Sequence, residues 1–283
     1  GSPNYADHVP AEDGFLAARL KAAGAIVIGK TNTPEFGLGS HTFNAVFGAT
    51  RNPWNTGMTA GGSSGGASVA LAMRMLPFAD GSDMMGSLRN PAGWANVMGF
   101  RPSWGRVPNA DSPDLYAHQL STDGPMGRSA ADMALLLDAM AGFDPRAPLS
   151  LADAPGAFLA GLEGAEGAAK GLRIGWMGDW NGRWAMEPGI LETCERALGV
   201  LEGLGAEVTP LTPDHPAEAV WESWTTLRSW SVAAKWAEDF AEPAKRAAMK
   251  PEAIWEVERG LALSAMDGVI RSRLRLARQG LVI

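Results

Sequence analysis

The chain has 283 residues, which is enough for one or two domains with a substantial core. Its 24 basic and 31 acidic residues leave a net charge of −7, which argues against a nucleic-acid-binding protein. One cysteine and four scattered histidines disfavour a disulfide framework and a zinc site. The sequence shows neither an apolar run of membrane-spanning length nor a signal peptide, so we expect a cytoplasmic protein.

In chain order, regular segments alternate with glycine-rich loops. Helical spacing of apolar side chains predicts helices at residues 12–23, 67–75 and 130–140. Between the first two, the Ala-Ile-Val-Ile run at residues 25–28 is typical of a short buried strand. Stretches rich in Gly, Ser, Asn and Pro predict ordered loops at residues 37–66 and 81–108.

The second half of the chain follows a connecting segment at residues 145–170. A strand, a helix and a second strand are expected at residues 172–176, 188–204 and 206–209, and this order predicts a parallel strand pair. Cys194 lies in that helix at a plausible core position. Residues 217–278 have a helical pattern with Trp221, Trp224 and Trp230, which form either core packing or an aromatic wall of a substrate pocket. The fold class is α/β.

Two glycine motifs match well-known patterns without the context that those patterns need. Residues 24–31 satisfy the phosphate-loop pattern. The variable positions of that pattern are, however, the predicted strand itself, and no helix start follows them. A nucleotide-binding protein is therefore a disfavoured alternative. Residues 61–65 satisfy Gly-x-Ser-x-Gly, but no hydrophobic strand precedes them. An ordinary Ser-His-Asp hydrolase, which would use His118 or His215, is disfavoured too.

A third pattern extends the second. The Gly-Gly-Ser-Ser-Gly-Gly run at residues 61–66 is followed by a second serine-bearing glycine loop, residues 81–91, which contains Ser87. Such loops let backbone N–H groups approach a ligand and hold an anion. A serine beside such a group of amides has the nucleophile and the oxyanion hole that acyl transfer requires.

With these motifs the sequence resembles the amidase signature family. The resemblance is carried by several ordered motifs, at residues 29–36, 47–54, 61–66, 81–91, 99–108 and 121–129. It implies an α/β/α sandwich in which a large mixed β-sheet is covered by helices. It also implies a single amidase domain over residues 1–283, with a signature core at 1–142 and a variable, substrate-side half at 171–283.

The resemblance assigns a role to each residue of the two serine loops. Ser87 matches the nucleophile, and Ser63 matches the bridging serine, which follows Gly62 through a cis peptide bond. The backbone amides of Met84, Met85, Gly86 and Ser87 match the oxyanion hole. Ser64 matches a supporting serine, while Asp83 and Arg89 match the pair that fixes the loop. At Met85 many members have glycine, so the larger side chain should narrow the acyl pocket.

The family's catalytic base is a lysine in a Gly-x-Pro-x-x-x-Lys-Asp segment, and none of the six lysines here lies in one. Lys30 belongs to a different, structural motif. We therefore expect a domain that is incomplete at the N-terminus, and at the C-terminus too, and whose activity is in doubt.

The resemblance implies hydrolysis of a small-molecule carboxamide without metal or cofactor. The alternatives are a glutamyl-tRNA amidotransferase A-type subunit and a non-catalytic remnant. A homodimer stays open, and no nucleic-acid or membrane partner is expected.

Overall fold

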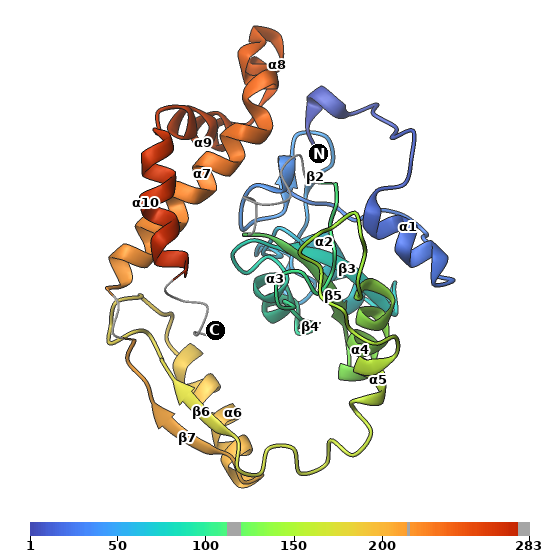
Figure 1. Cartoon of the computed structure of the whole chain (residues 1–283), viewed down its shortest axis with the longest axis vertical. Coiled ribbons are helices and arrows are strands. Elements are labelled where there is room, and N and C mark those ends of the chain that lie inside the picture. Colours follow the sequence, from blue (N-terminus) through green and yellow to red (C-terminus); the bar gives the residue numbers. More distant parts are fainter. Residues whose placement is uncertain (112–119, 214–215, 277–283) are drawn as a thin grey trace. The chain divides into compact units, whose positions relative to one another are not determined.

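The computed structural model describes residues 1–111, 120–213 and 216–276, so His118 and His215 lie outside the described residues. The chain divides into two compact units. Figure 1 labels their helices and strands. The first unit consists of Gly1–Ala160 and Ser231–Arg259, and the second of Gly161–Trp230 and Gly260–Ile283.

A three-stranded antiparallel sheet lies at the centre of the first unit. Its strands, in spatial order, are β3 (Phe78–Asp83), β5 (Thr122–Gly127) and β4 (Met98–Gly99). Two helices pack against it, α2 (Gly65–Ala72) and α3 (Arg89–Ala95). Their apolar faces meet the sheet in a buried cluster of Ala67, Leu71, Leu88, Ala92 and Met126. Both serine loops adjoin this cluster, because one leads into α2 and the other joins β3 to α3.

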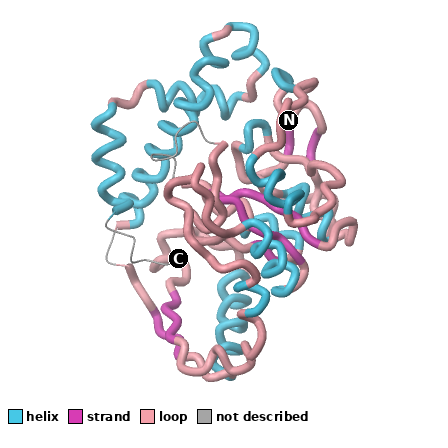
Figure 2. The backbone as a smooth tube through the Cα atoms, turned by 45° about the vertical axis from the view of Figure 1, so that its right-hand side comes forward, coloured by secondary structure: helices cyan, strands magenta, loops and turns pink. Residues whose placement is uncertain are grey.

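Further helices cover the sheet and its loops. The second apolar cluster involves α1 (Phe15–Ala22) and α4 (Ala130–Met140), and the short helix α5 (Ala157–Ala160) packs beside α4. Ser129 caps α4 in a capping box with Asp132. The remaining short elements of the N-terminal segment are η1 (Pro3–Tyr5), η2 (Glu35–Gly37), β1 (Phe43–Asn44) and β2 (Gly48–Ala49). Loops make up much of this region (Figure 2).

Three helices follow one another in the C-terminal part of the chain: α7 (Ala217–Ala241), α8 (Pro243–Ala248) and α9 (Pro251–Leu261). The second unit holds the predicted strand–helix–strand segment. There β6 (Arg173–Trp176) pairs in parallel with β7 (Glu207–Pro210), and α6 (Ile190–Gly203) connects them, as the sequence predicts. Helix α10 (Ala265–Leu276) ends the described chain.

Two core positions expected from the sequence in the second unit are not buried in the structure. Cys194 is exposed on α6, not buried in a core. Trp221 is 45% exposed, so it is not a core residue either. Instead its ring packs against those of Trp224 and Trp184, with centroids 5.2 Å and 6.2 Å away. Trp180, Trp184, Trp221 and Trp224 thus form a row of edge-on and tilted rings, in which Trp221 is the exposed member.

The prediction of a buried strand at residues 25–28 is wrong. The segment has no regular structure, and its Ile26 and Ile28 side chains are 89% and 74% exposed. An apolar run becomes a strand only when another strand pairs with it, and no strand does so within the described residues. No helix follows residues 29–31 directly either, as a phosphate loop would need.

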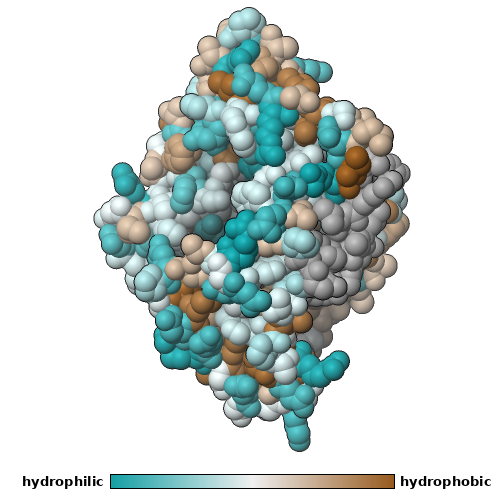
Figure 3. Space-filling view, turned by 90° about the vertical axis from the view of Figure 1, so that its left-hand side faces the viewer, coloured by the Kyte–Doolittle hydropathy of each residue, from teal (hydrophilic) through white to brown (hydrophobic). Residues whose placement is uncertain are grey.

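Residues 81–108, whose Gly, Pro and Ser content favours loops, also contain regular elements. The end of β3, helix α3 and strand β4 all fall in this range. The α/β class is confirmed, and the strands of the described residues form three small sheets, one parallel and two antiparallel. None of the described helices is both long and apolar enough to span a membrane. On the face drawn in Figure 3, hydrophobic side chains form small separate patches.

The cluster between the sheet and α2 should dominate the stability of the first unit. We expect Leu71→Ala to lower the free energy of unfolding by about 2–5 kcal/mol, because Leu71 is fully buried and its removal leaves a cavity. Urea unfolding followed by far-ultraviolet circular dichroism measures the change. Met73→Ala, at the exposed end of the same helix, is the control and should change stability by less than about 0.5 kcal/mol. Equal losses in the two variants would contradict this description of the core.

Candidate active site

The fold places the two serine-bearing loops side by side. The Ser64 N–H donates a hydrogen bond to the Ser87 carbonyl oxygen at 3.3 Å. The Ser64 hydroxyl lies within hydrogen-bonding distance of both backbone groups of Ser82, accepting from the N–H at 3.3 Å and donating to the carbonyl at 3.4 Å. Ser64 therefore joins the start of α2 to the end of β3, next to the loops that carry Ser63 and Ser87.

The loop of Ser63 has a backbone that few residues could adopt. The peptide bond between Gly62 and Ser63 is cis, and Ser63 is almost fully buried. A Cβ atom on Gly62 would lie only 3.0 Å from backbone atoms of Ser40 and His41. The close approach of the segment before Thr42 thus requires glycine at position 62.

Thr42 holds both ends of this loop. Its hydroxyl donates to the Gly61 carbonyl at 2.9 Å and accepts from the Gly65 N–H at 3.1 Å, while its own N–H donates to the Gly61 carbonyl at 3.0 Å. Sequence reasoning missed Thr42, because it precedes the serine loop by some twenty residues and belongs to none of the motifs that carry the resemblance. Its fully buried side chain satisfies the Gly61 carbonyl of the loop and the N–H of Gly65, the first residue of α2, which has no partner within the helix.

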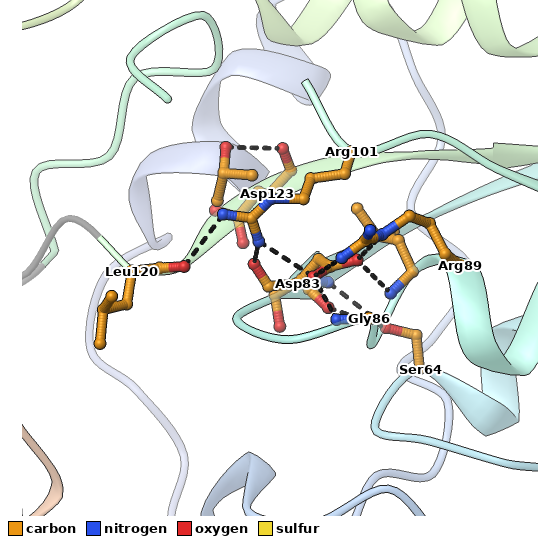
Figure 4. A network of polar contacts seen from close by, with 10 residues as sticks. Ser64, Asp83, Gly86, Arg89, Arg101, Leu120 and Asp123 are labelled. Atoms are coloured by element: carbon orange, nitrogen blue, oxygen red, sulfur yellow. Dashed lines mark hydrogen bonds and ion pairs between the residues drawn. The ribbon is translucent and has the colours of Figure 1, made fainter. Parts of the chain in front are cut away.

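A buried carboxylate organises the second loop. Asp83 is fully buried at the end of β3, and its two oxygens accept hydrogen bonds from the backbone as well as from two arginines (Figure 4). The Gly86 and Leu88 N–H groups donate at 2.6 Å and 3.2 Å. The guanidinium of Arg89 donates at 3.1 Å and 3.3 Å, and that of Arg101 donates at 2.9 Å. The pair of Asp83 and Arg89 is therefore not a surface ion pair.

These partners decide the charge of Asp83. Burial on its own raises the pKa of this carboxyl, but the hydrogen bonds from Arg89 and Gly86 outweigh burial and lower the pKa to about 2. Asp83 is consequently ionised over the whole physiological range. A permanently charged acceptor can hold the turn at residues 84–87 in one conformation.

Arg101 is a second residue that sequence reasoning missed. It donates to the Asp83 carboxylate and backbone carbonyl, and also to the Leu120 carbonyl at 3.1 Å. Arg101 lies in the motif at residues 99–108, which carries part of the resemblance but does not by itself indicate a role for this side chain. Arg101 ties the end of β3 to the segment that leads into β5.

The turn at residues 84–87 does not present every expected oxyanion donor. The Gly86 N–H is bonded to Asp83, so in this conformation it faces the carboxylate and not a substrate oxygen. Met85, two residues before Ser87 in the chain, is 50% exposed, so its large apolar side chain is not packed into the core. No hydrogen bond of the described residues joins the hydroxyls of Ser63 and Ser87, and such bonds often tighten only when substrate binds.

A further carboxylate, Asp123, stands opposite Ser82 in the neighbouring strand. Burial, together with the nearby Asp80 carboxylate, raises the pKa of Asp123 to about 6, although the Asn109 side chain donates to it at 3.3 Å. Its charge at neutral pH is thus a cost to the folded state. It differs in this respect from Asp83, whose charge is stabilised by cations and backbone amides.

Known families and proteins include clear relatives of this chain. The model of the family described as Amidase matches residues 1–260. This chain belongs to the Amidase family. The amidase-family chain is 40% identical, over 223 residues, to a protein of Rhodococcus erythropolis named acylamidase. It is 42% identical, over 220 residues, to the A-type subunit of a glutamyl-tRNA(Gln) amidotransferase from Burkholderia mallei. These matches cover 78% and 75% of this chain.

Among solved structures, a bacterial aryl acylamidase of the amidase signature enzymes is similar, with a TM-score of 0.84 and 27% sequence identity. The match covers 94% of this amidase-family chain and 55% of that structure. The chain spans 46% of the acylamidase and 44% of the amidotransferase subunit, which is less than half of the length of these curated relatives.

The low pKa of Asp83 makes the stability of the chain depend on pH in a defined direction. Because the folded pKa of about 2 lies below the ordinary value of about 4, the ionised carboxylate should contribute about 2 kcal/mol at neutral pH. This contribution is present above about pH 4 and is lost as the pH falls towards 2. We expect Asp83→Asn to be less stable than the wild type at pH 7 and the difference to shrink between pH 4 and 2. Urea unfolding at a series of pH values measures it, and a difference that does not change with pH would refute the assignment.

The raised pKa of Asp123 predicts that its contribution to stability changes with pH in the direction opposite to that of Asp83. Since the folded pKa of about 6 exceeds the ordinary value of about 4, protonation favours the folded state, and stability is lost as the pH rises through 6. We expect Asp123→Asn to be more stable than the wild type by about 2–3 kcal/mol at pH 8 and nearly equal to it at pH 4. The same unfolding experiment tests this. A variant that is less stable at pH 8 would show that the Asp123 charge is compensated.

Proposed function

We propose that the protein containing this chain is an amidase that hydrolyses a small-molecule carboxamide through an acyl-enzyme on Ser87. The single observation that carries the proposal is the adjacency of the two serine loops, joined by Ser64 and held by Thr42 and Asp83. The loops bring a candidate nucleophile, a candidate proton relay and a turn of backbone amides into one small region. This combination is what acyl transfer requires.

The proposed reaction begins with proton transfer from Ser87 to Ser63, which passes its own proton to a base. The Ser87 oxygen attacks the carbonyl carbon, and backbone amides of the turn at residues 84–87 stabilise the oxyanion. With Gly86 bonded to Asp83, Met85 and Ser87 are the N–H donors that we favour. The C–N bond then breaks, the leaving amine takes a proton from Ser63, and water hydrolyses the ester of Ser87.

We propose a neutral lysine as the base, supplied by a part of the family's length that this chain does not span. Its pKa would have to fall from about 10.4 towards 7–8, which costs roughly 4 kcal/mol and needs burial or cationic neighbours. Among the lysines of this chain, Lys30 is exposed and Lys245 has its pKa raised by Glu242 and Asp239, so neither is suited to that role.

We propose N-acyl amides with an apolar or aromatic group as the substrate class. Three observations support this: the names of the acylamidase and aryl acylamidase relatives, the exposed Met85 beside Ser87, and the 11 tryptophans of the sequence. A cytoplasmic location and the absence of a nucleic-acid partner are parts of the same proposal, in keeping with the net charge of −7.

The amidotransferase subunit is a second candidate, favoured by the 42% identity to its Burkholderia counterpart. The two candidates differ in where the ammonia goes. A stand-alone amidase releases it without other proteins, whereas the amidotransferase component delivers it to a partner. Glutamine-dependent amidation of Glu-tRNA on addition of the partner subunits would establish the second candidate and overturn the first.

Covalent labelling tests the roles of the two serines. A fluorophosphonate probe should modify Ser87 alone, as shown by peptide mapping, and Ser87→Ala should abolish the modification. We expect Ser63→Ala to slow the labelling by about 100-fold or more, because the relay that removes the Ser87 proton is lost. Ser103→Ala, at an exposed serine of the same unit, is the matched control. The experiment uses the protein that contains this chain together with the proposed lysine. Labelling of another residue there, or none in a folded sample, would contradict the proposal.

A further inference from the structure

The segment just before Thr42 has an unusual backbone. Phe36 has a φ of 57°, in the left-handed region that bulky side chains rarely adopt, and Gly37 and Gly39 follow with φ values of 70° and 123°. A turn of this kind persists only where its surroundings hold it. The residues that hold it come from helices α7 and α9, some 200 positions further along the chain.

Two polar contacts clamp the turn to the start of α9. The Glu35 carboxylate is 3% exposed and accepts a hydrogen bond from the Lys250 N–H at 2.8 Å, directly before the first residue of the helix. In the opposite direction, the Lys250 ammonium group donates to the Leu38 carbonyl. The Glu35 side chain thus bonds to the backbone of Lys250, and the Lys250 side chain bonds to the backbone of the turn. A carboxylate at a helix N-terminus is also stabilised by the helix dipole.

Apolar packing supports the same arrangement. The Phe36 ring packs against the ring of Trp236 of α7, with centroids 4.0 Å apart and planes tilted by 35°. Leu38 is buried in a cluster with Val232, Ala233, Met249, Ala253 and Val257. The turn is therefore fixed both by hydrogen bonds and by the packing of its two large side chains, of which Leu38 is buried and Phe36 partly buried.

The turn leads directly to the loop of the bridging serine. The backbone of Ser40 and His41 lies against Gly62, and Thr42 bonds to Gly61 and Gly65 on either side of the cis peptide. Between Leu38 and Thr42 there are only three residues. A displacement of the turn would therefore be transmitted over a short stretch of chain to Thr42 and from there to the loop of Ser63.

We propose that Glu35 and Lys250 are positioning residues for Ser63. The clamp that they form holds the turn at residues 35–39, and the turn sets the place of Thr42 and hence of the cis peptide before Ser63. The inference deepens the proposed function, on which it rests for its consequence in catalysis. By this inference, the residue directly before α9 helps to set the relative position of Ser63 and Ser87.

The test uses Lys250→Met, which keeps most of the side-chain stem but removes the donor to Leu38. Lys250→Arg, which restores a cationic donor, is the rescue variant. Lys21→Met is the matched control, because Lys21 forms an exposed ion pair with Asp13 away from the turn. Hydrogen exchange by mass spectrometry, on peptides covering residues 37–44 and 59–67, is the first readout. The rate at which a fluorophosphonate labels Ser87 at saturating probe is the second.

In Lys250→Met we expect exchange at both peptides to rise about tenfold, since a charged donor to the turn is lost. The maximal labelling rate should fall about tenfold while the half-saturating probe concentration stays the same. Lys250→Arg should restore most of both values, and Lys21→Met should leave them unchanged.

Faster exchange confined to residues 37–44, with residues 59–67 protected as in the wild type, would overturn the positioning role. So would an identical response in Lys21→Met. If the wild type is not labelled at all, the proposed function fails for this chain, but the exchange at residues 59–67 still decides whether the clamp positions the serine loop. The two failures are thus distinguishable.

Discussion

The candidate site depends on the burial of one carboxylate. Asp83 has no exposed surface, and it sits where β3 ends and the turn to Ser87 begins. A buried charge without partners would be strongly unfavourable, so the surrounding chain has to supply donors, and it supplies two arginines and two backbone N–H groups. Satisfying this charge forces residues 84–89 into a turn around it. The position of Ser87 is a consequence of that requirement.

The loop of Ser63 is determined in a different way, by close approach and not by charge. Glycine at position 62 lets the backbone of residues 40–41 come near, and Thr42 supplies hydrogen bonds that the turn cannot make for itself. Ser64 then joins this neutral loop to the charged one. The two serines therefore belong to rigid structures of separate origin that meet at one point. This rigidity suits a site whose rate depends on geometry held before the substrate arrives.

The spacing of apolar residues along the sequence predicted the elements whose formation depends mainly on neighbouring residues. The apolar spacing of residues 130–140 and the strand–helix–strand order of residues 172–209 correspond to α4 and to the parallel pair of β6 and β7. Strand β3 contains Gly and Asp, and β5 contains Gly, Asp and Pro, so their pairing with each other and not their composition makes them strands. The apolar segment at residues 25–28 shows the reverse case, since it has strand composition without a partner strand among the described residues. The serines and Asp83 were predicted through contiguous motifs, whereas Thr42, Arg101, Glu35 and Lys250 act across long sequence separations that no local pattern records.

The central claim of the proposed function is that the Asp83 charge holds Ser87 in a reactive position. The most direct test is the rate of fluorophosphonate labelling at Ser87 in Asp83→Asn, measured at pH 7 in samples shown to be folded. Asp123→Asn is the control, because it removes a carboxylate from the adjacent strand without touching the turn. We predict that labelling in Asp83→Asn is at least about tenfold slower than in the wild type and the control, because the turn that carries Ser87 loses the charged acceptor of its hydrogen bonds. A folded Asp83→Asn protein that is labelled at the wild-type rate would contradict the claim.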